Sequence, residues 1–572
     1  MTDGLGLGGA YNETLIRIKA QGGDISRLGV AALMWISHAE RPLKVDELCH
    51  ALGVEIGSPD LDAGNVPSIG TLLACCQGLL AVDKEASTVR LIHFTLREHL
   101  QAHPEGLGTP HSTMAESCLS YLNSHQIKSL PSSRHLAPGG IPSLRYSSPA
   151  APFLGYSSLY SCSSSLEHSS LDSGAPLLEH SSLHSSTPPL ECSSEYSGSS
   201  SLECSTRHPH KPLLAYPLLS SRTASLQYSS PYPSPPFLEY ASLYWGMHAK
   251  RDLSDGAKQL ALRLFDNYSS HISAKILLRA EKWRFIHNNY DNTSLFSGLH
   301  CASFFGIVEI VALLVDVEGC DINQVDCTGS TPLLWAALNG QEEVVEVLLG
   351  RGDIDPDRAG GSGETPLWCA AKNGHEGVVK LLLGREDVNP DNESRSKETP
   401  LWCAAKNGHE GVVNMLLRRK INPDKPNEYG ETPLWWASLN GHVEVVKMLL
   451  ERGDVNPDRP GSGGRAPLSC AAENGHMGVV EVLLGKSEVN PDKPDKLGRT
   501  PLFSAGLNGH EGVVKILLGR DEVNPDKPDI HGQTPRSCAA GSDHAELAAL
   551  LSLTSTVCSV TNALKAPAPS PL

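Results

Sequence analysis

Several short strings in this sequence contain the residues of phosphate-binding motifs. Gly4, Gly6 and Gly9 have the spacing of a dinucleotide-binding loop. That loop needs a strand before it, and no strand can precede it so close to the N-terminus. Gly485-Lys486-Ser487 resembles the end of a phosphate-binding loop, yet Val480 stands where that loop requires glycine. We therefore expect no nucleotide site at either string.

The residue patterns of hydrolases and metal sites are also incomplete. His375-Glu376 opens no zinc-protease helix, because Val379 occupies the place of the second histidine, and the Gly-x-Ser-x-Gly string of α/β-hydrolases does not occur. Histidines recur in five Asn-Gly-His turns: His375, His409, His442, His476 and His510. Stacked helices lie about 8–10 Å apart, whereas zinc ligands lie about 2 Å from the metal. We expect these histidines to bond nearby backbone, and we predict no enzyme, metal or cofactor.

The histidine turns belong to a unit of 33 or 34 residues that recurs eight times. Its phase is set by Thr-Pro pairs that begin at Thr331, Thr365, Thr399, Thr432, Thr500 and Thr534. The threonine predicts a helix N-cap, and the proline fits the first helical position. Asn-Gly then ends the first helix, and a second apolar helix follows. One such pair cannot bury its own apolar face, so we expect the copies to stack.

This unit resembles the ankyrin repeat, whose signature is Thr-Pro-Leu-His-x-Ala. The resemblance implies an α-solenoid of about eight repeats over 293–553, and we expect a helical cap over 246–292 and a disordered tail over 554–572. The signature histidine survives as His300, and three copies have tryptophan instead: Trp368, Trp402 and Trp435. We expect the hydrogen-bonding role of the histidine to be lost in those copies. Packing between them should then depend on aromatic area.

Ankyrin arrays hold a protein ligand in a groove formed by turn tips and by the inner face of the first helices. Transferred by motif position, the resemblance places these residues in the groove: Leu338, Lys372, Lys406, Leu439, Glu473 and Leu507. The tips carry varied residues, among them Arg395, Lys397, Tyr429, Lys496 and Arg499. The copies are alike at their apolar positions and differ at the tips, so we expect the tips to set specificity.

Composition restricts the partners and the compartment. The net charge of −17 argues against a general nucleic-acid binder. Five of the 15 cysteines share one slot of the first helix: Cys301, Cys369, Cys403, Cys470 and Cys538. This placement indicates small buried hydrophobes in a reducing compartment. We expect no signal peptide, because the start lacks a positive region followed by an apolar core, and no apolar run approaches the roughly 18 residues of a membrane span. We therefore expect a cytoplasmic protein, with the nucleus as an alternative, and no membrane partner.

Residues 1–125 predict a winged-helix domain with flanking helices. The expected order is helices at 11–20, 28–38, 45–52 and 68–77, a hairpin of 79–82 with 88–94, and a last helix from Thr95. The helix at 68–77, SIGTLLACCQ, would be the recognition helix of a DNA-binding domain. It has no Lys or Arg and is mostly apolar, so we expect it to pack against protein rather than bind DNA.

The strings WISHAERPLKVDELCHAL and GLLAVDKEASTVRLIHFTLREHL resemble the winged helix that follows the NACHT-type NTPase in fungal STAND receptors with ankyrin arrays. Family catalogues name this segment after GPI inositol-deacylase, and the name transfers no activity. The resemblance implies a relay between a nucleotide switch and a sensor in self/non-self recognition. The NTPase is missing from this chain, so an NTPase-bearing partner is expected. The alternatives are part of a larger NTPase and a DNA-binding regulator with a partner-binding array.

Residues 126–245 are rich in Ser, Pro, Leu and Tyr and predict a disordered linker. A short unit recurs in this range as PFLGYSSLY at Pro152, PLLEHSSLH at Pro176 and PFLEYASLY at Pro236. Together these segments predict a mainly α chain: a winged helix, a long linker and a helical repeat array that acts as an interaction scaffold.

Overall fold

The computed structural model describes residues 7–104, 107–130, 235–280, 295–542 and 544–552. These residues belong to one compact unit. Helices account for 57% of the structure and strands for 2%, which confirms the mainly helical fold class. The predicted linker lies outside the described residues over 131–234, as do residues 281–294 of the predicted cap and first repeat and the C-terminal tail from residue 553.

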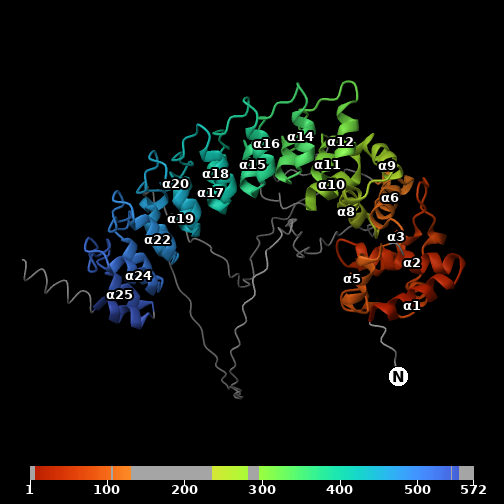
Figure 1. Cartoon of the computed structure of the whole chain (residues 1–572), viewed down its shortest axis with the longest axis horizontal. Coiled ribbons are helices and arrows are strands. Elements are labelled where there is room, and N and C mark those ends of the chain that lie inside the picture. The colour runs from red at the N-terminus through yellow and green to blue at the C-terminus, as the bar shows by residue number, and fades with distance from the viewer. Residues whose placement is uncertain (1–6, 105–106, 131–234, 281–294, 543, 553–572) are drawn as a thin grey trace, which may run out of the picture. The chain divides into compact units, whose positions relative to one another are not determined.

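The first domain has the order of elements that the sequence predicts, with one additional strand (Figure 1). Its elements are α1 (Leu7–Ala20), α2 (Gly23–His38), β1 (Leu43–Lys44), α3 (Val45–Gly53), α4 (Ile69–Cys75), β2 (Leu80–Asp83), β3 (Thr88–Leu91) and α5 (Phe94–Ala102). The sheet has the antiparallel order β1-β3-β2, with Leu43 opposite Val89 and Leu80 opposite Leu91. Strand β1 was not predicted, because two residues are too few to show an alternating pattern.

A group of helices lies between the winged helix and the repeats, namely α6 (Pro110–Asn123), α7 (His125–Lys128), α8 (Leu238–Arg251), α9 (Asp255–Phe265) and α10 (Ile272–Ala280). Helices α6 and α8 are neighbours, although residues 131–234 separate them in sequence. The first part of helix α8, to residue 245, and its preceding turn fall inside the range predicted as linker. They are ordered here because Phe237, Tyr240 and Trp245 are fully buried. The sequence-based boundary at 245 therefore lies too late.

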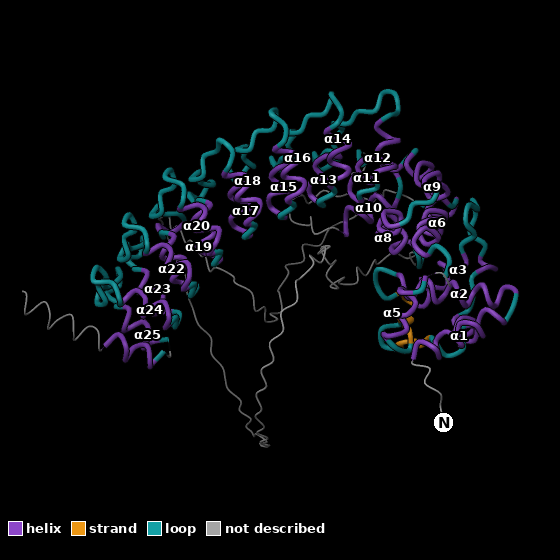
Figure 2. The backbone as a smooth tube through the Cα atoms, viewed as in Figure 1, coloured by secondary structure: helices purple, strands orange, loops and turns teal. Residues whose placement is uncertain are grey.

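The repeats form successive antiparallel helix pairs (Figure 2). The described first helices are α11 (Gly298–Phe305), α13 (Pro332–Leu338), α15 (Pro366–Asn373), α17 (Pro400–Asn407), α19 (Pro433–Asn440), α21 (Pro467–Glu473), α23 (Pro501–Leu507) and α25 (Pro535–Gly541). The described second helices are α12 (Val308–Val315), α14 (Glu342–Leu349), α16 (Glu376–Leu383), α18 (Glu410–Leu417), α20 (Val443–Leu450), α22 (Met477–Leu484) and α24 (Glu511–Leu518). Short 3₁₀ turns lie at Ala63–Asn65, Tyr268–Ser270 and Ser462–Gly464.

The caps of the first helices are those that the Thr-Pro phase predicts. Each threonine side chain accepts a hydrogen bond from the backbone N–H three residues later, as Thr365 does from Trp368 at 3.2 Å. At the other end, Gly374 adopts a left-handed φ of 75°. A side chain there would be strained, and an added Cβ would also lie 2.6 Å from the His409 ring in the next copy. The Asn-Gly turn is therefore required both by its own backbone and by its neighbour.

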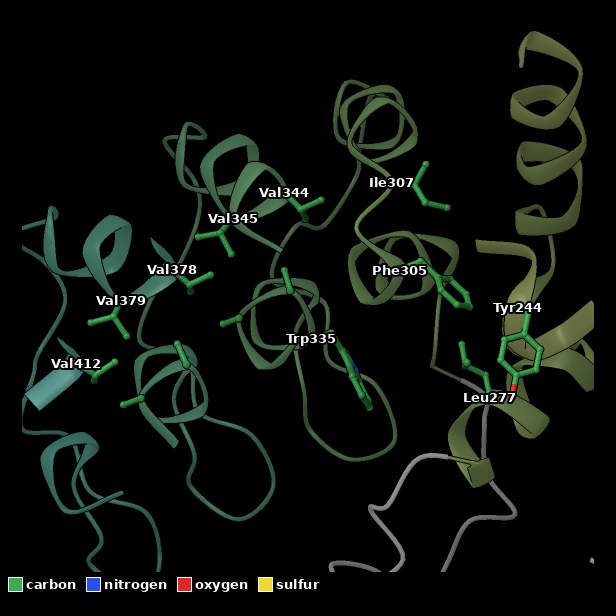
Figure 3. Packing of buried hydrophobic residues seen from close by; sticks show 14 of the residues in the cluster. Tyr244, Leu277, Phe305, Ile307, Trp335, Val344, Val345, Val378, Val379 and Val412 are labelled. Carbon is green, nitrogen blue, oxygen red and sulfur yellow. The ribbon is translucent and has the colours of Figure 1, made fainter. Parts of the chain in front are cut away.

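The core of the array lies between successive helix pairs. Paired valines from consecutive second helices, including Val344, Val345, Val378 and Val379, are fully buried and face the neighbouring copies (Figure 3). The five cysteines that share one slot are all buried, as the sequence predicts for small apolar side chains. Every interior copy is thus covered on both sides by its neighbours, as expected for a solenoid.

Candidate protein-binding surface

The turn histidines join each repeat to the one before it. Their Nε2 atoms lie 2.9–3.1 Å from the backbone carbonyl oxygens of Leu338, Lys372, Lys406, Leu439 and Glu473. This confirms that the histidines bond backbone. The accepting residues are five of the six predicted groove positions, so the array itself fixes the backbone at those positions. Across the described residues, no three His, Cys, Asp or Glu side chains gather as a metal site would require.

The indoles at the signature slot correct one expectation. His300 approaches the Ser330 carbonyl, just before the next threonine cap, with Nε2 at 3.2 Å. Trp402 Nε1 donates to the Glu431 carbonyl at 3.0 Å, and Trp435 Nε1 donates to the Arg465 carbonyl at 3.0 Å. Both acceptors occupy the position equivalent to Ser330. The prediction that the hydrogen-bonding role is lost was therefore wrong for Trp402 and Trp435, because their indole N–H groups reach the same carbonyl.

Trp368 departs from this pattern. Its side chain is 5% exposed, and its Nε1 is buried without a hydrogen-bond partner among the described residues. A buried donor without a partner carries a desolvation cost of about 1–3 kcal/mol. The repeat that contains Trp368 therefore keeps a buried indole N–H without a partner among the described residues, whereas the next repeat pairs the equivalent N–H with a carbonyl.

A second apolar cluster, separate from the main core, is formed by side chains of the first helices. Its buried members are Leu334, Trp368, Cys369, Trp402 and Cys403, and the half-buried Leu338 and Trp436 pack against it. Trp436 was missed by the sequence reasoning. It stands at the slot that holds cysteine in the two preceding copies, and that exchange of a small residue for a large one was the available signal.

Two lysines lie over the indoles of this second cluster. Lys372 Nζ lies 4.8 Å from the centre of the Trp368 ring. Lys406 Nζ lies 4.8 Å from the Trp402 ring and 3.8 Å from the Trp436 ring. Lysine over an aromatic face is attracted by the ring quadrupole. Lys372 is exposed, whereas Lys406 is half-buried, and burial lowers the pKa of its ammonium group.

Carboxylates near these lysines make the surface mixed in charge. Burial raises the pKa of Glu398, and the charges of Lys406 and Lys372 act in the opposite direction. Glu431 accepts a hydrogen bond from Trp436 Nε1 at 2.9 Å. Glu473, a predicted groove residue, is ion-paired with Arg465. The surface therefore offers aromatic, cationic and anionic groups close together, a combination suited to a polypeptide ligand.

The predicted groove residues lie at or near the C-terminal ends of the first helices. Lys372 is exposed, and the half-buried positions are Leu338, Lys406, Leu439, Glu473 and Leu507. At the tips, Arg395, Lys397, Tyr429 and Lys496 are exposed, and Tyr429 is 65% exposed. Arg499 is half-buried in an ion pair with Asp495 at 3.0 Å. Their participation in binding stays a prediction.

The tips are held by their backbones. Arg395 N donates to the Ser362 carbonyl at 3.0 Å, and Lys496 N donates to the Gly463 carbonyl at 3.0 Å, which joins each tip to the one before it. Four side chains with little exposure accept hydrogen bonds from the tip backbones, namely Asp326, Asn427, Asp495 and Asp529. Sequence reasoning missed this group, although an Asp or Asn stands five residues before four of the Thr-Pro threonines. The exposed tip side chains therefore project from a fixed frame.

Helix α4 packs against α2 within the winged helix. Gly29 of α2 lies so close that an added Cβ would meet the Cys75 carbonyl oxygen at 3.0 Å, and Cys76 Sγ lies 3.5 Å from the Gly29 carbonyl oxygen. Leu72, Cys75 and Cys76 are buried. The face that α4 leaves exposed carries no charged side chain.

A polar pocket of about 430 Å³ lies beside α8, lined in part by His38, Glu40, Arg97, His111 and Arg251. His111 Nδ1 and the Nδ1 of the fully buried His248 are 3.0 Å apart, so one ring must be neutral to accept the hydrogen bond. Burial, with the nearby Arg251 cation, lowers the pKa of His111 to about 4.

The stacked helix pairs define a helical solenoid of repeats, attached to a winged helix. The family model for ankyrin repeats in sets of three copies matches six overlapping stretches, from 267–359 to 468–561. Together they span more than half of the 572 residues, so the chain belongs to the ankyrin-repeat family. The winged-helix domain of GPI inositol-deacylase matches residues 17–109. A search of curated proteins finds no match.

These two family matches indicate the general role of each domain. Ankyrin repeats are non-catalytic and imply protein partners, so the array is a protein–protein interaction scaffold. The second match covers the winged helix of the deacylase family and shows no catalytic domain. In the described parts of the chain, no helix combines the length and apolar character that crossing a membrane requires.

Proposed function

We propose that the surface formed by the ends of α13, α15, α17, α19 and α21, together with the turn tips, binds a segment of a protein partner. The observation that carries this proposal is the exposed Lys372 over the Trp368 indole, on an apolar cluster separate from the main core. Aromatic groups on a rigid frame are typical of interface anchors, and here an exposed cation lies on them. The varied tips Tyr429 and Lys496 are exposed and would add specificity.

Lys372 and Lys406 have different parts in this proposal. Lys406 contacts two indoles and is half-buried, so its charge is already satisfied within the array. Lys372 contacts one indole and is exposed, so it can meet a carboxylate or carbonyl of the partner. A partner segment with an acidic residue next to an apolar one fits the Lys372 cation and the apolar cluster beside it.

The test compares two lysines of one repeat in the full-length chain. Lys372→Glu should weaken retention of the partner found by affinity capture, because it reverses the charge at the proposed contact. Lys380→Glu makes the same charge change on the second helix α16 and should leave binding unchanged. Tyr429→Ala and Lys496→Ala should weaken binding to a smaller extent. Equal loss with Lys372→Glu and Lys380→Glu would contradict the proposed surface.

The same proposal includes a signalling role like that of fungal NLR-like receptors, with an NTPase-bearing partner at the winged helix. The resemblance of residues 1–125 to STAND receptors supports this role, and so does the apolar character of α4. Co-purification of an NTPase with the wild-type chain tests it. Calorimetric titration with ATP and GTP should show no binding to the chain alone, and micromolar binding would favour an enzyme.

DNA binding by the winged helix is the alternative. It would need cations on the exposed face of α4, which carries none. The full-length chain should therefore show no salt-dependent affinity for duplex DNA. Sub-micromolar binding that weakens steeply with added salt would reverse this ranking.

A further inference from the structure

Helix α8 and the turn before it pack against the winged-helix side through one short string, PFLEYASLY, at residues 236–244. Phe237 packs against Trp35 of α2 and Tyr121 of α6, with ring centres 5.5 and 5.1 Å apart. The Tyr240 hydroxyl accepts a hydrogen bond from the Glu40 backbone N–H at 3.2 Å. The Arg41 guanidinium lies 5.3 Å from the Tyr240 ring centre. This string therefore fills a site formed by α2, α6 and the turn at Glu40-Arg41. We call residues 236–244 the plug of this site.

The opposite face of α8 contacts the array side. Trp245 is fully buried against Phe265 and Phe305, with ring centres 5.9 and 5.3 Å apart. Gly246 permits this approach, because an added Cβ would lie 2.2 Å from the Phe305 ring. Helix α8 thus connects the winged-helix side to the first repeats through two different sets of residues.

The chain contains a second copy of the plug. Residues 152–160, PFLGYSSLY, are identical to residues 236–244 at seven of nine positions. The matches include the equivalents of the buried Phe237, Leu238, Tyr240, Ser242 and Tyr244. The two differences are Glu239, which is exposed, and Ala241, which is replaced by the slightly larger serine. Thus all but one of the buried plug side chains have an identical counterpart in the copy.

We propose that residues 152–160 of the same chain exchange with residues 236–244 for the site on α2 and α6. The reach is sufficient, since the roughly 20 residues after α7 can extend to about 70 Å. Gly155, in place of Glu239, lowers the helix propensity of the copy, so α8 is the preferred occupant. The copy continues with Ser161-Cys162, whereas α8 continues with Trp245-Gly246.

Exchange would therefore fill the winged-helix side of the site and empty the array side. The contacts of Trp245 with Phe265 and Phe305 have no equivalent in the copy. The copy would lose these contacts between α8 and the array side while keeping the aromatic site of α2 covered. The inference is independent of the ligand proposed for the array, because it concerns residues at the other end of the repeats.

Photocrosslinking in the full-length chain tests the exchange. Benzoylphenylalanine in place of Phe153 should crosslink to peptides of α2 and α6, which hold Trp35 and Tyr121. The same probe in place of Leu177 is the matched control, since PLLEHSSLH at 176–184 shares only five of the nine plug residues and has histidine at both tyrosine positions. A Phe237→Leu background should raise the yield from position 153 by up to about tenfold, because it weakens the competing plug without emptying the site.

Three results would overturn the proposal: equal crosslinking from positions 153 and 177, crosslinks from 153 that avoid α2 and α6, or a yield unchanged by Phe237→Leu. Mixing isotopically labelled and unlabelled chains identifies the occupant. Crosslinks confined to one label support exchange within the chain. Crosslinks between labels would place the occupant on a second copy and overturn the intramolecular form. Amide exchange of the Phe237→Leu chain verifies that the fold is intact.

Discussion

Two copies of the repeat have the same fifteen residues, at 365–379 and 399–413, and yet have different surroundings. In both copies the threonine caps the first helix and the lysine lies 4.8 Å from its tryptophan ring. Trp402 Nε1 donates to the Glu431 carbonyl, whereas Trp368 Nε1 is buried without a partner among the described residues. The differences come from the following copies, because each indole faces the next repeat. Identical sequence therefore gives one indole that is hydrogen-bonded to the next repeat and one whose N–H is buried without a partner among the described residues.

The largest expected effect is the removal of either indole. Trp402→Ala should destabilise its repeat by about 3–5 kcal/mol, since it empties a buried aromatic position. Trp368→Ala should cost less within that range, because no indole hydrogen bond is lost. Native-state amide exchange of α15–α18 in the full-length chain measures both, and the loss should spread to flanking repeats. A larger cost for Trp368→Ala would break the comparison.

The two lysines should separate stability from binding. Lys406→Ala should destabilise the array by about 1–2 kcal/mol, because Lys406 packs against two indoles. Lys372→Ala should cost under about 1 kcal/mol, as expected for an exposed side chain, while weakening the partner proposed above. Urea unfolding followed by tryptophan fluorescence gives the first quantity, and titration with the captured partner gives the second. Equal stability losses would show that the second indole adds nothing.

Phenylalanine substitutions isolate the hydrogen bond itself. Trp402→Phe should cost about 1 kcal/mol more than Trp368→Phe, because only the first removes an indole hydrogen bond. Both changes remove the same volume, so the difference between the two exchange free energies is the informative number. If the two variants are equally stable, the bond from Trp402 to Glu431 contributes nothing measurable.

The smallest effect concerns the tip between the two copies. Lys397 has a left-handed φ of 59°, whereas the tip after the second copy has Gly430 at the same place. Left-handed backbone is costly for a residue with a Cβ. Glycine avoids this cost but loses more conformational entropy on folding, which offsets part of the gain. Lys397→Gly should therefore stabilise the repeat by about 0.5 kcal/mol, measured as a shift of the urea midpoint. Gly430→Lys is the reverse control and should destabilise the array.

Local sequence determined the repeat period, the helix caps, the turn glycines and the buried cysteine slot, because each depends on residues close together in the chain. The winged-helix order and its hairpin were predicted for the same reason. Among the candidate site residues, motif position was enough to place Lys372 and Lys406 at the ends of their helices. Motif position could not predict that Lys406 contacts a second indole, because Trp436 belongs to the next repeat.

Tertiary structure alone decided the features that depend on residues far apart in sequence. The string PFLEYASLY lies within the segment predicted to be disordered, and it forms the start of α8 because Trp35 and Tyr121 pack against its aromatic rings. The indoles kept the hydrogen bond of the missing histidine because a carbonyl about 30 residues away lies within reach. A local pattern specifies which groups a helix presents. The neighbouring element decides whether those groups are buried, bonded or left for a partner.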